Sequence, residues 1–455
     1  MSDASGQSVV SPSGSGNVNG GPLPTRPDGV PPRPPRGLRN LGRALRSRNY
    51  RLFFLGQGIS VAGTWMQGAA LAWLVYRLTG SATMLGVVGF CGHICTFLIA
   101  PFAGTLADRW DRRRLAMATQ TLAMLQAFAL AALTMSGAVQ VWHILALAMV
   151  LGTVAAFDIP VRQALAVDMV ESRDDLSNAI ALNSFLVNGG KFVGPSVAGV
   201  LITHYGEGVC FAVNGVTYLA VIAALGAMRL APRVVAHKDH VLRALGEGLR
   251  YAAGAPPLRS ILLLLATVSL VGFSYNTLMP VFAKTILQGG PRTHGLLLSS
   301  AGVGALLGAV YLASRRSVPG LERIVALSPA LLGVSLGAFA LSRSLPLSMG
   351  VLTLAGFASM TQIAGSNTLL QTLVRDSHRG RVMSFYTMCF MGMGPFGSLL
   401  IGGLAGSLGA SQAVAISAAC SLAATVVFAT RLPMLSRQVR DACAESALPA
   451  APARS

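Results

Sequence analysis

The chain has 455 residues, of which 53% are hydrophobic and only 11% are charged, and its mean hydropathy is +0.60. Because a soluble domain carries about 25% charged residues, this composition excludes an ordinary soluble protein and indicates an integral membrane protein. The formal net charge is +19, but the basic residues gather at every second junction between apolar stretches. That alternation is the positive-inside pattern of a multi-span protein, and it accounts for the charge without nucleic acid as a partner.

The N-terminal tail, residues 1–48, is rich in Gly, Ser and Pro, and arginines follow the prolines. This composition predicts a disordered cytoplasmic tail that its charge holds against anionic lipid, with a transit peptide as the alternative. Since the tail contains no apolar core, we expect no signal peptide ahead of the first span.

Twelve apolar stretches follow the tail, each close to the roughly 20 residues that a helix needs to cross a bilayer. They predict an all-α membrane protein with two six-helix bundles, at residues 49–230 and 259–432. A polar stretch, 231–258, would link the bundles in the cytoplasm, and 433–455 would form a cytoplasmic tail. The expected helices cover about 52–76, 82–107, 115–135, 141–163, 178–203, 209–229, 259–284, 294–313, 321–341, 346–371, 381–406 and 410–431.

Four segments resemble motifs of the major facilitator superfamily. They are GTLADRWDRRR (104–114), DIPVRQAL (158–165), NAIALNS (178–184) and KFVGPSVAG (191–199). The first is similar to the loop motif G-x-L-A-D-R-x-G-R-[KR]-x, with Asp111 in place of its second glycine. Together they resemble the branch of enterobactin exporter-like and macrolide-efflux-like proteins, the transmembrane secretion effectors. The resemblance implies the major facilitator fold and a secondary transporter whose two halves alternate around a central site.

The loop motif implies a gate between the second and third spans. In the family, its acid and arginines hold the cytoplasmic side shut, in part against the start of the eleventh span, here near residues 379–383. The alternative is a charge cluster that only sets the topology. The matching loop of the second half, 308–316, has no acid, so the gate would be one-sided. The residues that match the motif are Gly104, Asp108, Arg109, Arg112 and Arg113.

Two charged residues lie inside apolar stretches, Asp158 in the fourth and Lys191 in the fifth. A charge at the bilayer centre costs roughly 2.5–3.5 kcal/mol on insertion scales, so each is expected to be paired or functional. Asp158 can pair with Arg162, one helical turn away, or with Lys191 across helices. The carboxylate is either part of a structural ion pair or a group that takes up and releases a proton during transport.

The fifth stretch carries small residues at helical spacing, Gly190, Gly194 and Gly199, with Pro195 among them. Small residues allow two helices to approach closely, and a proline bends a helix. The segment resembles the antiporter motif of the family, while generic helix packing is the alternative.

If the resemblance holds, polar and aromatic residues of the cavity-lining spans would contact the substrate. As a group they predict a mainly apolar cavity with few charges, which suits a bulky amphipathic molecule. The candidates are Gln57, Thr64, Trp65, Gln67, Tyr275, Asn276, Gln362 and Asn367.

The chain lacks the motifs for ATP binding, zinc hydrolysis and serine hydrolysis. We therefore expect no cofactor, no metal site and no enzyme activity, and an ion gradient as the energy source. The leading hypothesis is a monomeric, proton-coupled exporter of a siderophore or a drug-like compound in the bacterial cytoplasmic membrane. An importer or facilitator of the same fold is the first alternative, and a non-transporting receptor or intramembrane enzyme is the second.

Overall fold

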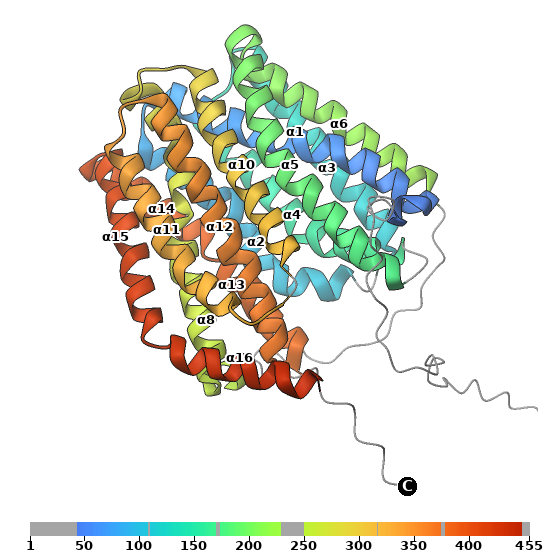
Figure 1. Cartoon of the computed structure of the whole chain (residues 1–455). Helices are drawn as coiled ribbons and strands as arrows, with labels where there is room; N and C mark the ends of the chain where they lie inside the picture. Colours follow the sequence, from blue (N-terminus) through green and yellow to red (C-terminus); the bar gives the residue numbers. More distant parts are fainter. Residues whose placement is uncertain are drawn as a thin grey trace, which may run out of the picture. The chain divides into compact units, whose positions relative to one another are not determined.

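The computed structural model describes residues 43–107, 110–169, 173–228, 250–315, 317–374 and 378–447, all within the unit Gly42–Ser455. These residues are almost entirely helical, and no strand occurs among them. Twelve of the helical segments are long and apolar enough to cross a membrane. The predicted fold class, an all-α protein with twelve transmembrane helices, is confirmed (Figure 1).

The first six spans are single helices; the first five cover the stretches predicted for them, while the sixth ends two residues before its predicted end. The structure extends most of them by a turn, because the polar residues that flank an apolar stretch continue the helix beyond the membrane-spanning part. The bounds are α1 (Arg48–Thr79), α2 (Ala82–Ala107), α3 (Arg112–Met135), α4 (Val141–Asp168), α5 (Arg173–Tyr205) and α6 (Glu207–Ala227).

Four of the last six spans are also single helices. Their bounds are α10 (Pro291–Ser314), α11 (Leu321–Leu341), α12 (Leu345–Leu373) and α15 (Ala410–Ala429).

The seventh span, Pro256–Ile286, is interrupted where the sequence predicts one continuous helix. A proline in the last third of the span, Pro280, removes a backbone donor and so favours a break there. The span is built from α8 (Pro256–Thr267), the π-helix η3 (Val268–Gly272), the 3₁₀-helix η4 (Ser274–Leu278), α9 (Met279–Val281) and the π-helix η5 (Phe282–Ile286).

The eleventh span is interrupted too. It consists of α13 (Arg379–Met391) and α14 (Gly394–Leu408), and Pro395 lies in the first turn of α14. Interrupted helices occur at membrane depth where the freed backbone groups are buried in protein or line water. Both interruptions therefore point to spans that face the interior of the protein.

Both predicted tails and the predicted linker are shorter than the sequence suggested. The 3₁₀-helix η2 (Arg43–Arg46) lies in the predicted tail, yet Ala44 is buried and donates its N–H to the Asn178 side chain. At the end of the linker, Ala252 and Leu258 are buried. In each case an apolar side chain within a polar stretch has a hydrophobic cluster to pack against.

The C-terminal segment forms a helix, α16 (Leu432–Ala447), which the sequence analysis missed. Leu435 and Val439, one turn apart, are buried, and the helix packs on α11, α12 and α15. The Ser436 hydroxyl donates a hydrogen bond to Glu322 of α11. The apolar residues of this helix lie on one side and pack against the bundle. The segment is polar on average, so its mean hydropathy does not reveal that apolar side.

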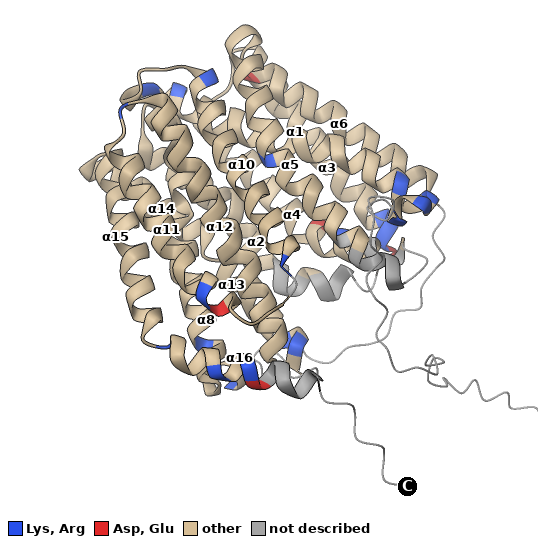
Figure 2. Ribbon diagram, viewed as in Figure 1, with Lys and Arg blue, Asp and Glu red and all other residues tan. Residues whose placement is uncertain are grey.

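The helices connect alternately at two ends. We call one the short-loop end; its connections lie at residues 80–81, 136–140, 206, 287–290, 342–344 and 409. The other, which carries the arginine-rich connections, we call the basic end. Figure 2 shows Lys and Arg at both ends and very little charge along the middle of the helices.

Two helix pairs join the halves, α5 with α10 and α2 with α14. Both helix pairs pack closely because glycines lie at the contact. Between α2 and α14 a glycine faces a glycine, and between α5 and α10 a glycine faces the backbone of the other helix. A Cβ atom on Gly402 would lie 2.7 Å from Gly86 Cα, and one on Gly302 would lie 2.7 Å from the Lys191 carbonyl oxygen. Cβ atoms do not approach other atoms this closely, so only glycine fits at these positions.

The contacts described between the halves lie from the middle of the bundle to the short-loop end. They include a 2.7 Å hydrogen bond between the Tyr76 and Thr285 hydroxyls, close to that end. Toward the basic end, residues 183–185 of α5 are exposed. Among the residues that the structure describes, the contacts between the halves therefore lie toward the short-loop end, and this part of α5 on the basic side is not covered by the other half.

Candidate functional site

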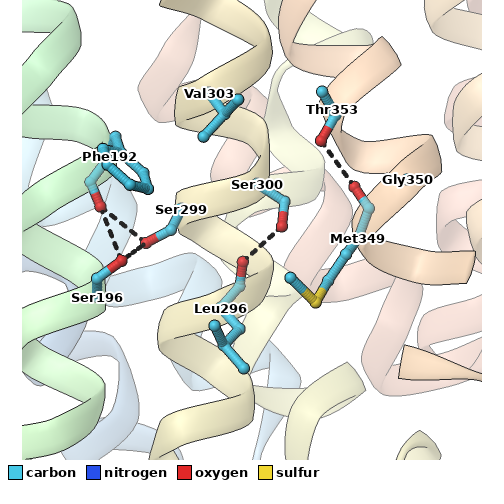
Figure 3. A pocket seen from close by; sticks show the side chains of 9 residues that line it. All are labelled: Phe192, Ser196, Leu296, Ser299, Ser300, Val303, Met349, Gly350 and Thr353. Carbon is cyan, nitrogen blue, oxygen red and sulfur yellow. Dashed lines mark hydrogen bonds between the residues drawn. The ribbon is translucent and has the colours of Figure 1, made fainter. Parts of the chain in front are cut away.

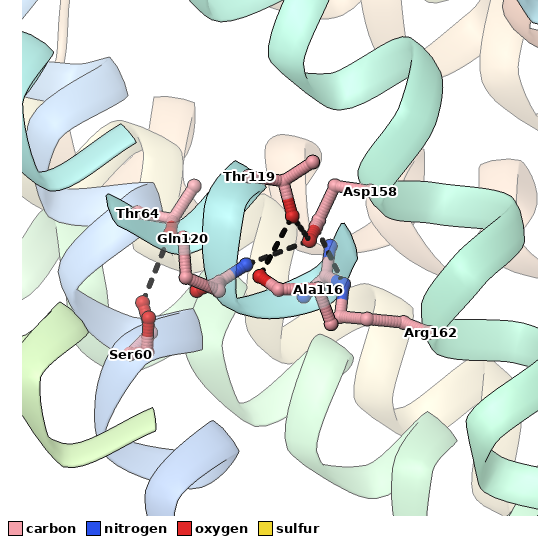
Figure 4. A network of polar contacts seen from close by, with 7 residues as sticks. All are labelled: Ser60, Thr64, Ala116, Thr119, Gln120, Asp158 and Arg162. Atoms are coloured by element: carbon pink, nitrogen blue, oxygen red, sulfur yellow. Dashed lines mark hydrogen bonds and ion pairs between the residues drawn. The ribbon is translucent and has the colours of Figure 1, made fainter. Parts of the chain in front are cut away.

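Asp158 lies at the centre of a polar cluster inside the N-terminal half (Figure 4). Its Oδ2 accepts from Arg162 Nε at 2.7 Å, while Oδ1 accepts from Thr119 Oγ1 at 3.0 Å and Gln120 Nε2 at 2.7 Å. Of the two pairings that the sequence left open, the structure contains the one with Arg162. Three donors therefore satisfy both oxygens of this buried side chain.

Lys191, on α5, has no such partner. Its ammonium lies 5.3 Å from the centre of the Trp65 ring on α1, which is the range of a cation–π contact. Among the described residues, no carboxylate lies within ion-pair distance of Lys191. The alternative in which Lys191 pairs with Asp158 is not realised in this conformation.

The glycines of the α5 motif are packing residues in this structure. A Cβ atom on Gly190 would lie 3.1 Å from the Trp65 ring, and one on Gly194 would lie 2.6 Å from the Ala62 carbonyl oxygen, both on α1. On the other side of the helix, Gly199 faces Arg292 of α10, and Pro195 lies inside α5 without ending it. Helix packing, one of the two interpretations, is thus present; the antiporter interpretation stays a prediction.

The predicted gate is only partly visible. Gly104 lies within α2, but its surroundings, and Asp108 and Arg109 altogether, fall outside the described residues. Arg112 is the first residue of α3. Arg113 donates from its guanidinium to the Leu225 and Gly226 carbonyl oxygens, at the end of α6 in the same half.

Asp111, the departure from the family motif, has a clear local role. It is the N-cap of α3, and its side chain accepts a hydrogen bond of 2.7 Å from the Arg114 N–H. An aspartate satisfies one of the free N–H groups at a helix start, and its charge also favours the positive end of the helix dipole. A glycine at this position would leave that N–H without the side-chain acceptor.

Four of the predicted cavity residues have accessible side chains. Thr64 and Trp65 are exposed on α1, with Trp65 at 39%, and Asn276 is exposed on η4. Asn367 on α12 is partly exposed and accepts a hydrogen bond from Gln371. Figure 4 shows Thr64 near the Asp158 cluster.

The other four are buried. Gln67 donates to Gln126 of α3 at 3.0 Å and accepts from Asn214 of α6 at 2.7 Å, so it binds neighbouring helices rather than a cavity. Tyr275 is 2% exposed and belongs to the core of the C-terminal half. Gln57 and Gln362 are also buried, and the side-chain oxygen of each has no hydrogen-bond partner in the described structure.

His294 is a residue that the sequence analysis did not select. It is 1% exposed at the start of α10, its Nε2 lies 3.2 Å from the Ala69 carbonyl oxygen of α1, and its ring stacks on Trp73. This imidazole joins the two halves near the short-loop end. One histidine in an apolar stretch carries no signal of that role, because the contact is made with the other half.

A pocket of about 270 Å³ lies between α5, α10 and α12 (Figure 3). Its polar part is the seam between the halves, where Ser196 Oγ donates to Ser299 Oγ at 2.7 Å. None of the predicted cavity residues line it. The lining residues are Phe192, Ser196, Leu296, Ser299, Ser300, Val303, Met349, Gly350 and Thr353.

Comparison with known proteins places these features in a family. The sequence model of the transmembrane secretion effectors matches residues 43–453. The chain is 27% identical to the staphyloferrin A transporter of Staphylococcus aureus, over 83% of this chain and 95% of that protein. It is 26% identical to the multidrug efflux pump Tap of Mycolicibacterium fortuitum (76% and 87% covered), and 23% identical to the enterobactin exporter EntS of Escherichia coli (81% and 88% covered).

Solved structures agree with the fold. A bacterial homologue of the lysosomal transporter Spinster, in an inward-facing conformation, superposes with a TM-score of 0.64 at 15% identity, covering 89% of this chain and 99% of that one. A POT peptide transporter superposes with a TM-score of 0.68 at 14% identity, covering 89% and 97%. At such identities the likeness shows the fold alone.

Proposed function

Because the chain belongs to the transmembrane secretion effectors, a family of major facilitator transporters, we propose that it exports a small amphipathic compound, siderophore-like or drug-like, in exchange for protons. The observation that carries this proposal is the arrangement of the halves: their described contacts lie toward the short-loop end, while α5 is exposed on the basic side. A transporter that alternates between two openings needs such a state.

The direction of this opening follows from charge. The positive-inside rule assigns the basic end to the cytoplasm, and with it both termini. The described conformation would then receive a compound from the cytoplasm, as the first step of export requires. The protein would act as a monomer in the bacterial cytoplasmic membrane, with the lipid bilayer, a small molecule and H⁺ as its partners.

Proton coupling is assigned to Asp158. Its side chain is 7% exposed and that of Arg162 is 33% exposed, so Arg162 is the more accessible partner. While Arg162 stays in place, its guanidinium occupies Oδ2 of the carboxylate. Departure of Arg162 toward the open side would allow Asp158 to take up a proton, which links protonation to a structural change.

The gate belongs to the same proposal. In the described conformation Arg113 binds the end of α6 within its own half. When the basic end closes, Gly104, Asp108, Arg109 and Arg112 would meet the start of the eleventh span. The gate contacts would thus exist only when the basic end is closed. A contact that controls a switch between two states must differ between them.

The proposal is tested with everted membrane vesicles and an extract of spent medium. Deletion of the gene should first remove at least one compound from the medium, as mass spectrometry detects. Vesicles that contain the wild-type protein should then accumulate that compound only when their interior is acidified. Accumulation without an acid interior would favour a facilitator, and release from the vesicles on acidification would favour an importer.

The variant Asp158→Asn distinguishes a role of Asp158 in proton coupling from a purely structural role. We expect this variant to lose accumulation driven by the proton gradient but to keep one-for-one exchange of labelled for unlabelled compound, because exchange needs no proton. The matched control is Glu207→Gln, which neutralises another buried carboxylate paired with an arginine, Arg77, at 2.7 Å. Full proton-driven accumulation by Asp158→Asn would remove Asp158 from the coupling mechanism.

A further inference from the structure

Lys191 is a cation inside a membrane span, and its ammonium makes a cation–π contact with the Trp65 ring. Among the described residues, its side chain takes part in no ion pair or hydrogen bond. An intramembrane charge is costly when nothing compensates it. A cation–π contact supplies about 0.5–2 kcal/mol, less than an anionic partner gives.

The place of Lys191 on α5 indicates where its side chain points. Gly190 and Gly194 face α1, and Pro195 and Gly199 face α10. Three valines on the opposite side of α5 are exposed and suited to lipid: Val193 at 42%, Val197 at 41% and Val200 at 49%. At 100° per residue, Lys191 lies between the sides that face α1 and α10 and away from the valines. It therefore points into the space between the halves.

Trp65 borders the same space. Its side chain is 39% exposed although it lies in the middle of a span. Near it on α1, no atom lies within 4 Å of the position that a Cβ on Gly68 would occupy. The indole thus lies beside open volume, and Lys191, which is partly exposed, lies next to it.

The Asp158 carboxylate is already bound by other residues. Arg162, Thr119 and Gln120 already occupy both oxygens of Asp158. In the described part of the transport space, the Asp158–Arg162 pair is neutral and Lys191 leaves one positive charge uncompensated. A site of this kind attracts a negative group.

We propose that the transported compound carries an anionic group, a carboxylate or a sulfonate, which the Lys191 ammonium binds while an apolar part of the compound packs against Trp65. This assignment rests on the proposed transport function and adds a substrate class to it. It also gives Lys191 a role different from that of Asp158, since Lys191 selects the cargo and Asp158 carries the proton.

The test uses the full-length protein in lipid nanodiscs and three probes that share one aromatic group. The probes are 2-naphthylacetate, the neutral 2-naphthylacetamide and the cation 2-(2-naphthyl)ethylammonium, and calorimetry measures their binding. We expect the wild type to bind the anion about tenfold or more tightly than the amide, because an ionic hydrogen bond is lost in the amide complex. The cation should bind more weakly still.

Variants assign this preference to one residue. Lys191→Met and Lys191→Gln should bind the anion and the amide equally, whereas Lys191→Arg should keep the preference. Lys284→Met is the matched control, since Lys284 also lies over an aromatic ring, 5.7 Å from the centre of Tyr76, but at the short-loop end. It should behave as the wild type. Thermal unfolding identifies any variant that fails to fold. The preference of the wild type for the anion over the amide can be tested without any variant.

Three results would overturn the inference: equal affinity of the wild type for the three probes, no binding of naphthylacetate up to its solubility limit, or a preference that survives in Lys191→Met. Each is distinct from failure of the transport proposal, which would show as no gradient-driven accumulation by the wild type in vesicles. Transport of a neutral compound, unaffected in Lys191→Met, would leave the exporter standing and remove this subsite.

Discussion

Thr64 and Gln67 lie one turn apart on α1, and the sequence gives them the same expected role. In the structure Thr64 is exposed, while Gln67 lies inside the N-terminal half and binds α3 and α6. A polar residue in an apolar helix indicates that a partner exists, because an unpaired polar group in hydrocarbon is costly. It does not indicate whether that partner is a ligand or another helix.

Replacement of Gln67 by leucine should therefore affect stability rather than substrate choice. The change removes the partners of Gln126 and Asn214 inside the bundle, which we expect to lower the free energy of unfolding by about 1–3 kcal/mol. Thermal unfolding in detergent measures this, with Thr64→Val as the comparison on the exposed face. A Gln67→Leu protein that unfolds like Thr64→Val but exports different compounds would contradict the assignment.

The helix α5 shows how one element serves both halves. It contacts α1 through Gly190 and Gly194 and contacts α10 through Gly199, and it holds Lys191 between these two sides. Small residues are needed on both sides because two backbones approach it closely. The small-residue pattern is visible in the sequence, whereas the identity of the two helices that it meets is not.

Gly194→Ala should weaken the contact between α1 and α5. The added methyl group would lie 2.6 Å from the Ala62 carbonyl oxygen and 2.8 Å from the Met66 nitrogen, which are backbone atoms that cannot turn away. We expect a loss of about 1–3 kcal/mol, as for overpacked cores. Gly189→Ala, five residues earlier on the same helix, has no atom within 4 Å of its Cβ position and should be neutral or slightly stabilising. Chemical denaturation of both variants checks the difference; equal effects would argue against this contact.

At the scale of the whole molecule, the two halves meet along a seam formed mainly by α5 with α10 and by α2 with α14. The seam is made by glycines on α2, α5, α10 and α14 and by a few polar contacts, including His294 with the Ala69 carbonyl oxygen. Aromatic rings also meet across it, Phe97 with Phe396 and Trp73 with His294. Under the proposed alternating access, the two bundles would exchange contacts along this seam while each keeps its own packing.

Accessibility of α5 to a membrane-impermeant thiol reagent tests this arrangement. In a protein whose native cysteines are replaced, Ser184→Cys, on the exposed part of α5, should react in everted vesicles and much more slowly in intact cells. Ser299→Cys, buried in the seam at 3% exposure, should react slowly in both. Rapid labelling of Ser184→Cys from outside intact cells would mean that the basic end does not face the cytoplasm or that the space is open outward.

The twelve spans follow from the sequence alone, because the length and hydropathy of each stretch are local properties that the bilayer imposes directly. The N-cap at Asp111 and the small-residue side of α5 also depend only on residues close together in the sequence. The tertiary structure decided the rest: that Arg162 and not Lys191 pairs with Asp158, that Gln67 faces other helices, that His294 joins the halves, and that the C-terminal segment packs as α16. Asp158 and Arg162 lie one helical turn apart, so the sequence could suggest their pairing, but the choice against Lys191 depends on how α4 and α5 pack. The other outcomes depend on residues up to 225 positions apart, which only folding brings together.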